Sequence, residues 1–378
     1  MNAQRWAWAE IDLGALRHNV EALAAHIGPQ QLWAVVKADA YGHGAIECAR
    51  VALQSGAHGL CVALVSEGIA LRQAGINAPI LIMSEQPAEQ HRDIISYGLI
   101  ATLYNEATIT QFASTAHELE IMASVHMKVD SGMHRVGVPP EDAVKMAKLI
   151  AESPWLSLEG VFTHLATADV ADTQFAQQQV SAFSRSVEQV RACGIEVRHV
   201  HVSNSASAIR KLDAGAGCTM ARVGIALYGI PGDAQTDSFG AAHQLGLRPV
   251  MSVHARVSHV QRVTAGQGVS YGLKRPLEHD ATVATIPLGY ADGVPRGLWE
   301  SGSVLIGGVR RTFAGVVTMD QIMVNCADDV VRIGDSVVLI GAQGSERVTA
   351  NEWAHKMGTI GYEIVCAISA RMPRNYIN

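Results

Sequence analysis

Lys37 is the residue whose position most clearly suggests chemistry. It ends the apolar run Leu-Trp-Ala-Val-Val at residues 32–36, so we expect its ammonium group to lie above an apolar base. An ammonium group that loses water has a lowered pKa and is nucleophilic, which suits it to imine formation with an aldehyde or a ketone. The alternative is a lysine whose stem lies along apolar surface while its charge stays in water. Position alone leaves the two interpretations open.

Few other lysines resemble Lys37. Only seven of the 29 Lys and Arg residues are lysines, and five of these lie in polar or helical contexts. The other one, Lys128, follows an apolar stretch and shares the segment MKVDSGMHRVG (127–137) with Asp130 and Arg135. A structural salt-bridge cluster and a functional cluster are equally consistent with this segment.

Further polar residues follow apolar runs. His164 ends the run LEGVFTH, and Ser203-Asn204-Ser205 follows RHVHV. Arg222 is followed closely by Gly224, and the backbone N–H groups that this glycine leaves accessible are able to bind a phosphate. If these runs are parallel strands of one barrel, their carboxyl ends meet on a single face, where barrel enzymes place their catalytic groups.

The first 230 residues alternate short apolar runs with amphipathic segments, which is the pattern of βαβ units in a parallel sheet. Eight such units in roughly 200–250 residues predict an α/β fold, the closed (β/α)8 barrel. A doubly wound sheet is the rival, but it usually has fewer strands and a glycine-rich first turn. The runs are Leu32–Lys37, Gly59–Ala63, Pro79–Met83, Leu99–Leu103, Ser124–Val129, Leu158–His164, Arg198–Val202 and Met220–Tyr228.

A second domain follows the barrel. From Gly246 onward, alternating apolar and polar residues with glycine-rich turns predict a mostly antiparallel β domain, with a short helix near Ala350–Met357. Pro231–Phe239 is the predicted linker. We therefore assign residues 1–237 to the barrel and residues 238–378 to the β domain.

Composition argues against several classes of protein. A net charge of −6 without any block of Lys or Arg does not fit a nucleic-acid-binding protein. No run approaches the roughly 18 apolar residues of a membrane span, and the first residues lack the pattern of a signal peptide. The six cysteines include no Cys-x-x-Cys pair, which is typical of reduced, mostly buried thiols. We expect a cytoplasmic protein.

Seven motifs together resemble those of the alanine racemases, pyridoxal-phosphate enzymes built from a barrel and a C-terminal β domain. The resemblance extends from about Trp8 to Arg371, and the motifs occur in the family's order. They are VVKADAYGHG (Val35–Gly44), KVDSGMHRVG (Lys128–Gly137), SNSA (Ser203–Ala206), ARVGIALYG (Ala221–Gly229), VSYG (Val269–Gly272), GYADGVPR (Gly289–Arg296) and MDQ (Met319–Gln321).

The resemblance implies a two-base mechanism on a pyridoxal-phosphate aldimine that interconverts L- and D-alanine, supplying D-alanine for peptidoglycan. Lys37 matches the lysine that binds pyridoxal 5'-phosphate and acts as base for D-alanine, and Tyr271 matches the base for L-alanine. Racemisation requires acid/base groups on both faces of a planar carbanion. His164 and Arg222 match residues that support the phenolate of the tyrosine.

The resemblance also assigns residues to the cofactor. Arg222 matches an arginine that faces the pyridine nitrogen; because a guanidinium only donates, that nitrogen stays unprotonated and transamination is limited. The residues that match phosphate contacts are Tyr41, Ser205, Gly224, Ile225 and Tyr362.

Substrate binding is assigned in the same way. Arg135 matches an arginine near the substrate carboxylate, to which Met319 contributes its backbone N–H. Lys128 matches a lysine that is often carbamylated in the family, and the resulting anion would orient Arg135, whereas an unmodified lysine would repel it.

The resemblance further implies a homodimer with composite active sites, in which Tyr271, Met319 and Asp320 come from the second subunit. Tyr290 and Tyr362 would narrow the entrance. The supporting and entrance residues are Asp320, Tyr290, Asp169, Arg296 and Lys128. The chain departs from the family at Val316, where many members have an arginine that pairs with the residue matching Asp169.

Other functions remain as alternatives. A racemase of serine or of a broader range of small amino acids would share the fold. A metal-dependent barrel hydrolase could use the pair His199 and His201 together with a carbamylated Lys128. Decarboxylases of basic amino acids bring an acidic motif with a cysteine, which is not found at residues 319–321, and a single-barrel pyridoxal-phosphate carrier would lack the β domain.

Overall fold

The computed structural model describes residues 5–230 and 244–378, which form two compact units. The barrel unit comprises Leu16–Ala40 and Gly44–Arg248. The β unit comprises Met1–Ala15, Tyr41–His43 and Pro249–Asn378. The chain therefore leaves the barrel unit after Ala40 and returns to it at Gly44.

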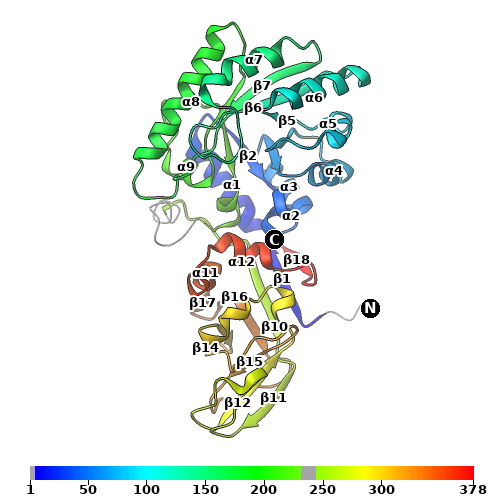
Figure 1. Cartoon of the computed structure of the whole chain (residues 1–378). Helices are drawn as coiled ribbons and strands as arrows, with labels where there is room; N and C mark the ends of the chain where they lie inside the picture. Colours follow the sequence, from blue (N-terminus) through cyan, green and yellow to red (C-terminus); the bar gives the residue numbers. More distant parts are fainter. Residues whose placement is uncertain (1–4, 231–243) are drawn as a thin grey trace. The chain divides into compact units, whose positions relative to one another are not determined.

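Within the described part of the chain, eight parallel strands form the core of the barrel unit, which confirms the predicted (β/α)8 fold (Figure 1). One run pairs in the order β4-β3-β2-β9 and the other in the order β5-β6-β7-β8. Backbone hydrogen bonds join the runs at both edges: Ile82 N donates to Ile100 O at 3.0 Å at one edge, and Thr219 N donates to Val200 O at 2.9 Å at the other. The strands are β2 (Gln31–Val35), β3 (Gly59–Val62), β4 (Ile80–Ile82), β5 (Ala101–Leu103), β6 (Ala123–Lys128), β7 (Leu156–Phe162), β8 (His199–His201) and β9 (Met220–Val223).

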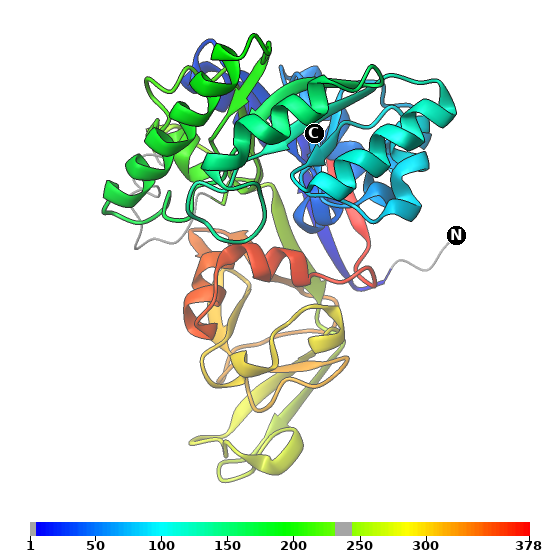
Figure 2. The same ribbon diagram turned by 45° about the horizontal axis from the view of Figure 1, so that its top comes forward.

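Helices alternate with these strands and bury their apolar faces against them. Figure 2 shows α7 and α8 (green) next to one another outside the strands. Side-chain caps start two of the helices: Asn105 accepts from Ala107 N at 2.9 Å, and Asn204 accepts from Ser207 N at 3.0 Å. The helices are α1 (Leu13–Ile27), α2 (Lys37–Gly42), α3 (Ala45–Gln54), α4 (Val65–Gln73), α5 (His91–Ser96), α6 (Glu106–Leu119), α7 (Ala143–Ala151), α8 (Gln174–Ala192) and α9 (Ser205–Arg210), with 3-10 turns η1 (Ala88–Gln90), η2 (Pro140–Asp142) and η3 (Ile225–Tyr228).

Two glycines make room for large rings inside the barrel. A Cβ atom on Gly59 would lie 2.8 Å from the ring of Trp33, and one on Gly160 would lie 2.7 Å from the ring of His126. Because real Cβ atoms do not approach rings this closely, only glycine fits at either position. The interior is thus a packed layer of aromatic and histidine side chains.

The β unit is built from two sheets, whose pairs are antiparallel except for β1 with β18 in the described residues. The larger sheet has the order β14-β13-β16-β10-β1-β18, with β17 beside β16, and the smaller has the order β11-β12-β15. The predicted helix at Ala350–Met357 is confirmed as α11. The elements are β1 (Ala7–Asp12), β10 (Met251–Arg256), β11 (His259–Val263), η4 (Tyr271–Leu273), β12 (Ala281–Ile286), η5 (Tyr290–Asp292), η6 (Arg296–Glu300), β13 (Ser303–Ile306), β14 (Val309–Thr312), β15 (Ile322–Asn325), β16 (Ser336–Gln343), β17 (Glu346–Val348), α12 (Gly361–Ala367) and β18 (Arg374–Ile377).

The first strand differs from the expected division of the chain. Residues 1–237 were assigned to the barrel, but β1 pairs with β10 and β18 and so belongs to the β unit. Its residues alternate between buried and half-buried, as in a strand of a sheet with one covered face, rather than being buried throughout like β3 of the barrel. The predicted boundary at residues 237 and 238 and the linker Pro231–Phe239 lie outside the described residues.

No helix in residues 5–230 and 244–378 is long and apolar enough to cross a membrane.

Candidate active site

Lys37 follows the end of β2, separated from it by Val36, and begins a turn with unusual backbone geometry. The four residues after it, Ala38 to Tyr41, have φ angles between 51° and 56°, so they form a left-handed turn without any glycine. For L-amino acids this conformation costs about 1–2 kcal/mol per residue. Such strain persists only where the surrounding contacts determine the conformation, and it is concentrated at functional sites.

The backbone before Lys37 is held by two buried contacts. Val36 N donates to Cys61 O at 2.9 Å, which joins the end of β2 to β3. The hydroxyl of Tyr228 donates to Val35 O at 3.0 Å from η3, on the other side of the same strand. Lys37 therefore lies at a rigid strand end.

Four cations of the barrel unit gather around His164. Burial and then the charges of Arg222, Arg135, Lys128 and Lys37 all lower the pKa of His164 well below its usual range. The structure thus brings together five residues that the sequence analysis selected from four different strand ends. Positive charge concentrated at a barrel mouth favours an anionic ligand.

Arg222 is buried, with 3% of its surface exposed, and its guanidinium is held by neutral acceptors. It donates to Thr163 O at 2.8 Å, to Val202 O at 3.1 Å, to His201 Nδ1 at 2.6 Å and to His164 Nδ1 at 3.4 Å. Burial lowers its pKa to about 10, so it remains protonated near neutral pH. No salt bridge to Arg222 is formed within the described part of the chain.

The contact with Arg222 determines the protonation of two buried histidines. Because a guanidinium only donates, His201 Nδ1 must accept, and its Nε2–H then donates to His126 Nδ1 at 2.9 Å. Burial and nearby positive groups lower the pKa of His126 to about 3 and that of His201 well below its usual range. Both rings are therefore neutral, with the proton on Nε2.

This arrangement places the His199-x-His201 pair in the barrel interior rather than in a metal site. Both ring nitrogens of His201 are already hydrogen-bonded, so neither is available as a ligand. In the residues that the structure describes, no three His, Cys, Asp or Glu side chains are arranged to hold a metal ion. His201 would have to give up one of these hydrogen bonds before it could bind a metal ion.

Ser205, Gly224 and Ile225 lie side by side where two helical segments begin. Ser205 is the first residue of α9, and its Oγ accepts from Gly224 N at 2.9 Å and from Ala226 N at 3.3 Å. A hydroxyl and backbone amides beside a cationic cluster are the donors that a phosphate requires. The donor set therefore fits the phosphate of pyridoxal 5'-phosphate.

Lys128 ends β6 and is 4% exposed. Burial, followed by the charges of Arg135 and Arg222, lowers its pKa to about 8. Its ammonium group lies 5.9 Å from the centre of the Phe162 ring. A large share of this lysine is therefore neutral at slightly alkaline pH.

In the β unit, the GYADGVPR and MDQ motifs are joined by backbone hydrogen bonds. Tyr290 N donates to Thr318 O at 2.9 Å, and Ala291 N donates to Met319 O at 3.1 Å. A Cβ atom on Gly289 would lie 2.1 Å from Thr318 O, so this approach requires glycine. Tyr290 and Met319 are held next to one another, with 42% and 52% of their surfaces exposed.

The VSYG motif packs against the segment that leads to Met319. Ser270 Oγ donates to Val316 O at 2.8 Å. Val316, the departure from the family pattern, is 1% exposed and belongs to the apolar interior of the β unit. Tyr271 is 73% exposed, an unusual state for a large ring.

Asp320 belongs to a chain of ion pairs within the β unit. Arg371 contacts Asp320 at 2.7 Å and the buried Asp292 at 3.4 Å. Arg5 contacts Asp292 from another direction at 2.8 Å. Neither arginine lies in one of the seven motifs, so the sequence gives no signal for either of them.

Tyr41 and Tyr362 meet in the β unit, with ring centres 6.5 Å apart in an edge-to-face arrangement. Arg374 supports this segment by donating to Gly42 O at 3.0 Å. A Cβ atom on Gly42 would lie 2.6 Å from Val365 O in α12, so the approach of the two segments depends on a glycine.

The two remaining predicted entrance residues lie in different units. Asp169 follows β7 in the barrel unit, in a loop whose carbonyls at Ala168 and Val170 accept from Arg210 at 2.7 Å and 2.6 Å. Arg296 begins η6 in the β unit and is exposed.

Comparison with known proteins identifies the family. The model of the alanine racemase N-terminal domain matches residues 11–231, and that of the C-terminal domain matches residues 250–376. The chain belongs to the alanine racemase family. An alanine racemase of Nostoc sp. is 41% identical over 376 residues, covering 97% of this chain and 95% of the relative. One from Symbiobacterium thermophilum is 40% identical, with 100% and 98% covered. The crystal structure of an alanine racemase from Streptomyces lavendulae has a TM-score of 0.94 at 34% identity and covers 100% of this chain and 98% of that chain.

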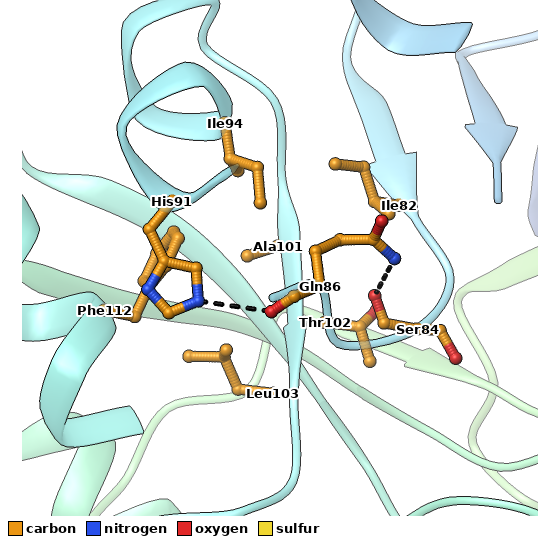
Figure 3. A pocket seen from close by; sticks show the side chains of 9 residues that line it. All are labelled: Ile82, Ser84, Gln86, His91, Ile94, Ala101, Thr102, Leu103 and Phe112. Atoms are coloured by element: carbon orange, nitrogen blue, oxygen red, sulfur yellow. Dashed lines mark hydrogen bonds between the residues drawn. The ribbon is translucent and has the colours of Figure 1, made fainter. Parts of the chain in front are cut away.

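A separate hollow of the barrel unit contains none of the residues that the alanine racemase motifs select. It lies between β4, β5 and the helices α5 and α6. Figure 3 shows the ring of His91 directed at the backbone oxygen of Gln86, with Nε2 3.3 Å from it, while the Gln86 side chain donates to Ser84 O at 3.1 Å. Burial lowers the pKa of His91. The hollow is lined by Ile82, Ser84, Gln86, His91, Ile94, Ala101, Thr102, Leu103 and Phe112.

The left-handed turn after Lys37 makes a prediction about stability. Ala38 is exposed and has a φ angle of 51°, so Ala38→Gly relieves steric strain in the folded state. This relief offsets the roughly 0.5–1 kcal/mol that a glycine costs in conformational entropy. We expect the free energy of unfolding to stay unchanged or to rise. Ala25→Gly, at an exposed position in the right-handed helix α1, should cost about 1 kcal/mol. Urea unfolding compares the two, and an equal loss in both variants would contradict the strain argument.

Proposed function

We propose that this chain is an amino-acid racemase that interconverts L- and D-alanine, with pyridoxal 5'-phosphate bound through Lys37. One observation carries the proposal. Lys37 lies at a strand end near a buried arginine that forms no ion pair with a carboxylate of the described residues and is held by neutral acceptors instead. Membership of the alanine racemase family supports the choice of alanine.

The cofactor, when bound, supplies an electron sink that makes the Cα proton of an attached amino acid acidic. Within the barrel unit, Lys37 would hold it covalently, while Ser205 and the backbone of Gly224 and Ile225 would hold its phosphate. We assign Tyr41 and Tyr362 of the β unit to the same phosphate through their hydroxyl groups. Hydroxyl and amide donors are suited to a dianion.

Arg222 would face the ring nitrogen of the cofactor. Its remaining N–H groups only donate, so the nitrogen is kept unprotonated and negative charge is held near Cα. The neutral pair His201 and His126 keeps the guanidinium in place without supplying a proton. His164, which is also neutral, completes the hydrogen-bonded support of Arg222.

Two bases on opposite faces of the substrate would exchange the Cα proton. We assign Lys37 Nζ to D-alanine and the phenolic oxygen of Tyr271 from a second subunit to L-alanine. The exposure of Tyr271 and Met319 in a single chain, 73% and 52%, supports a homodimer in which each β unit completes the partner's site. Asp320 would enter the same site beside Met319.

The substrate carboxylate would be bound by Arg135 and by the backbone N–H of Met319. We assign Tyr290, Asp169 and Arg296 to the entrance, where Tyr290 would favour a small side chain. A cytoplasmic enzyme that provides D-alanine for peptidoglycan is the physiological role that we propose.

The proposed activity is tested with the purified protein, added pyridoxal phosphate and single enantiomers of alanine in D2O. We expect both enantiomers to approach a racemic mixture, measured by loss of optical rotation, and serine run in parallel reports substrate breadth.

Tyr271→Phe should reduce racemisation by about 10²–10⁴-fold, the usual contribution of an acid/base group. It should still exchange the Cα hydrogen of D-alanine, while L-alanine should not exchange. Tyr376→Phe, at an exposed tyrosine of the same unit, is the control, and equal exchange of both enantiomers by Tyr271→Phe would refute the assignment.

Mixed dimers test the composite site. Neither Lys37→Ala nor Tyr271→Phe should racemise alanine alone. If the subunits are mixed and allowed to exchange, each heterodimer carries one site with both defects and one intact site. Random exchange should therefore restore about a quarter of the wild-type rate, since half of the dimers are heterodimers with one working site. Recovery that is absent despite exchange, measured by native mass spectrometry, would show that both bases come from one chain.

We further propose that Lys128 is carbamylated. The neutral amine attacks CO2, an N–C bond forms and one proton is released, so that a cation becomes an anion beside Arg135. Because the pKa of Lys128 is about 8, the reactive neutral form increases as the pH rises through that value.

Carbamylation predicts that enzyme prepared without CO2 gains activity when bicarbonate is added and that, at equal concentrations of dissolved CO2, it gains activity faster at pH 8.5 than at about pH 7. Lys128→Arg keeps the positive charge but cannot be carbamylated, so its activity should not respond to bicarbonate. Native mass spectrometry should show the added mass of one CO2 in the wild type only. A wild-type protein without this added mass at saturating bicarbonate would exclude the modification.

A further inference from the structure

We propose that Glu67 is a positioning residue for Lys37, an inference that rests on the proposed role of Lys37 in binding the cofactor. Glu67 lies in the first turn of α4, after β3. Its Oε1 accepts from Ala38 N at 2.6 Å. Its Oε2 accepts from Ala63 N at 2.8 Å and from Leu64 N at 3.1 Å. A single carboxylate thus joins the turn after Lys37 to the end of the neighbouring strand.

One of these three contacts belongs to an ordinary helix start. A glutamate at the third position of a helix often accepts from the backbone N–H of the residue that caps it, which accounts for the contact with Leu64. The bond to Ala38 crosses 29 positions of sequence and has no part in capping α4. It is also the shortest of the three.

The bond to Ala38 lies where it can orient Lys37. Ala38 N belongs to the peptide group that follows Lys37, and Val36 N, just before it, donates to Cys61 O at 2.9 Å. Lys37 is therefore held on both sides by groups at the end of β3. Because the turn after Lys37 is left-handed and strained, its conformation depends on such contacts. A charged acceptor makes roughly twice as strong a hydrogen bond as a neutral one.

The same barrel contains a matched control at a different strand end. Glu85 Oε1 accepts from Tyr104 N at 2.5 Å and from Asn105 N at 2.6 Å, just after β5. The chemistry is the same, a carboxylate that holds backbone N–H groups at the end of a parallel strand. No residue of the proposed site lies on β5.

Replacement by glutamine separates the two halves of the contact. Glutamine keeps one acceptor oxygen, which can continue to cap α4 at Ala63 and Leu64. Its NH2 group then faces Ala38 N–H, so the donor on the Lys37 side loses its partner. The fold is retained while the positioning contact is lost.

The experiment compares Glu67→Gln and Glu85→Gln as holoenzymes. In hydrogen exchange, we expect residues 37–44 to exchange about tenfold faster in Glu67→Gln, and residues 103–108 faster in Glu85→Gln, as each local contact is lost. Visible circular dichroism of the bound cofactor should weaken only in Glu67→Gln. With alanine, kcat should fall about tenfold in Glu67→Gln with KM changed less than about twofold, because orientation of Lys37 rather than substrate binding is affected. Glu85→Gln should keep both constants.

The outcomes separate this inference from the proposed function. Borohydride reduction followed by peptide mapping of the wild type shows whether Lys37 carries the cofactor. If it does not, the proposed function fails, and the positioning role fails with it. If Lys37 is tagged but the two variants agree in circular dichroism, in kcat and in exchange at residues 37–44, Glu67 is only a helix cap and the inference is overturned.

Discussion

A buried guanidinium held by neutral groups is the constraint on which the barrel site depends. Burying a charge costs several kcal/mol unless its surroundings compensate it, and no carboxylate of the described residues forms an ion pair with Arg222. Compensation comes instead from acceptors at the ends of β7 and β8, which converge on a side chain of β9. Closure of the barrel is therefore what makes this arginine tolerable. The glycines at 59 and 160 contribute by giving the rings beneath it room to pack.

The electrostatics of the mouth follow from that constraint. Arg222 is paired with no carboxylate in the described residues, and burial together with the charges of Arg222, Arg135, Lys128 and Lys37 lowers the pKa of His164. The histidines in contact with the guanidinium stay neutral and act as acceptors. Such a site favours an anionic ligand and withholds protons from it, which are the two conditions that the proposed racemisation requires.

Backbone strain in the barrel site lies in the four residues after Lys37. Four consecutive L-residues in the left-handed region would not persist in an isolated peptide. Contacts from β3, η3 and Glu67 hold the strand end from which the turn starts. The resulting rigidity gives Lys37 a defined direction, which a flexible four-carbon side chain does not have by itself.

Much of the fold could be predicted from the sequence because its signals are local. Each barrel strand lies within or beside a predicted apolar run, and the helix at Ala350–Met357 has its predicted bounds. The assignment of β1 was less successful, since the choice between the barrel and the β sheet depends on partners more than 200 positions away. Tyr271, Met319 and Tyr290 were selected from motifs, while the contacts of Arg371 and Glu67 could not be predicted because each joins groups that are distant in the sequence.

The sequence by itself determined the number and order of the barrel strands, the polar residues that end them and the family to which the motifs belong. Periodicity and composition carry this information because they reflect neighbours along the chain. Only the tertiary structure decided the protonation and the hydrogen-bond partners of these polar residues. The acceptor role of His201, the lowered pKa of Lys128 and the bond from Ala38 to Glu67 all depend on groups brought together by barrel closure. His126 and His201 are 75 positions apart, and no local pattern records which of their nitrogens carries the proton.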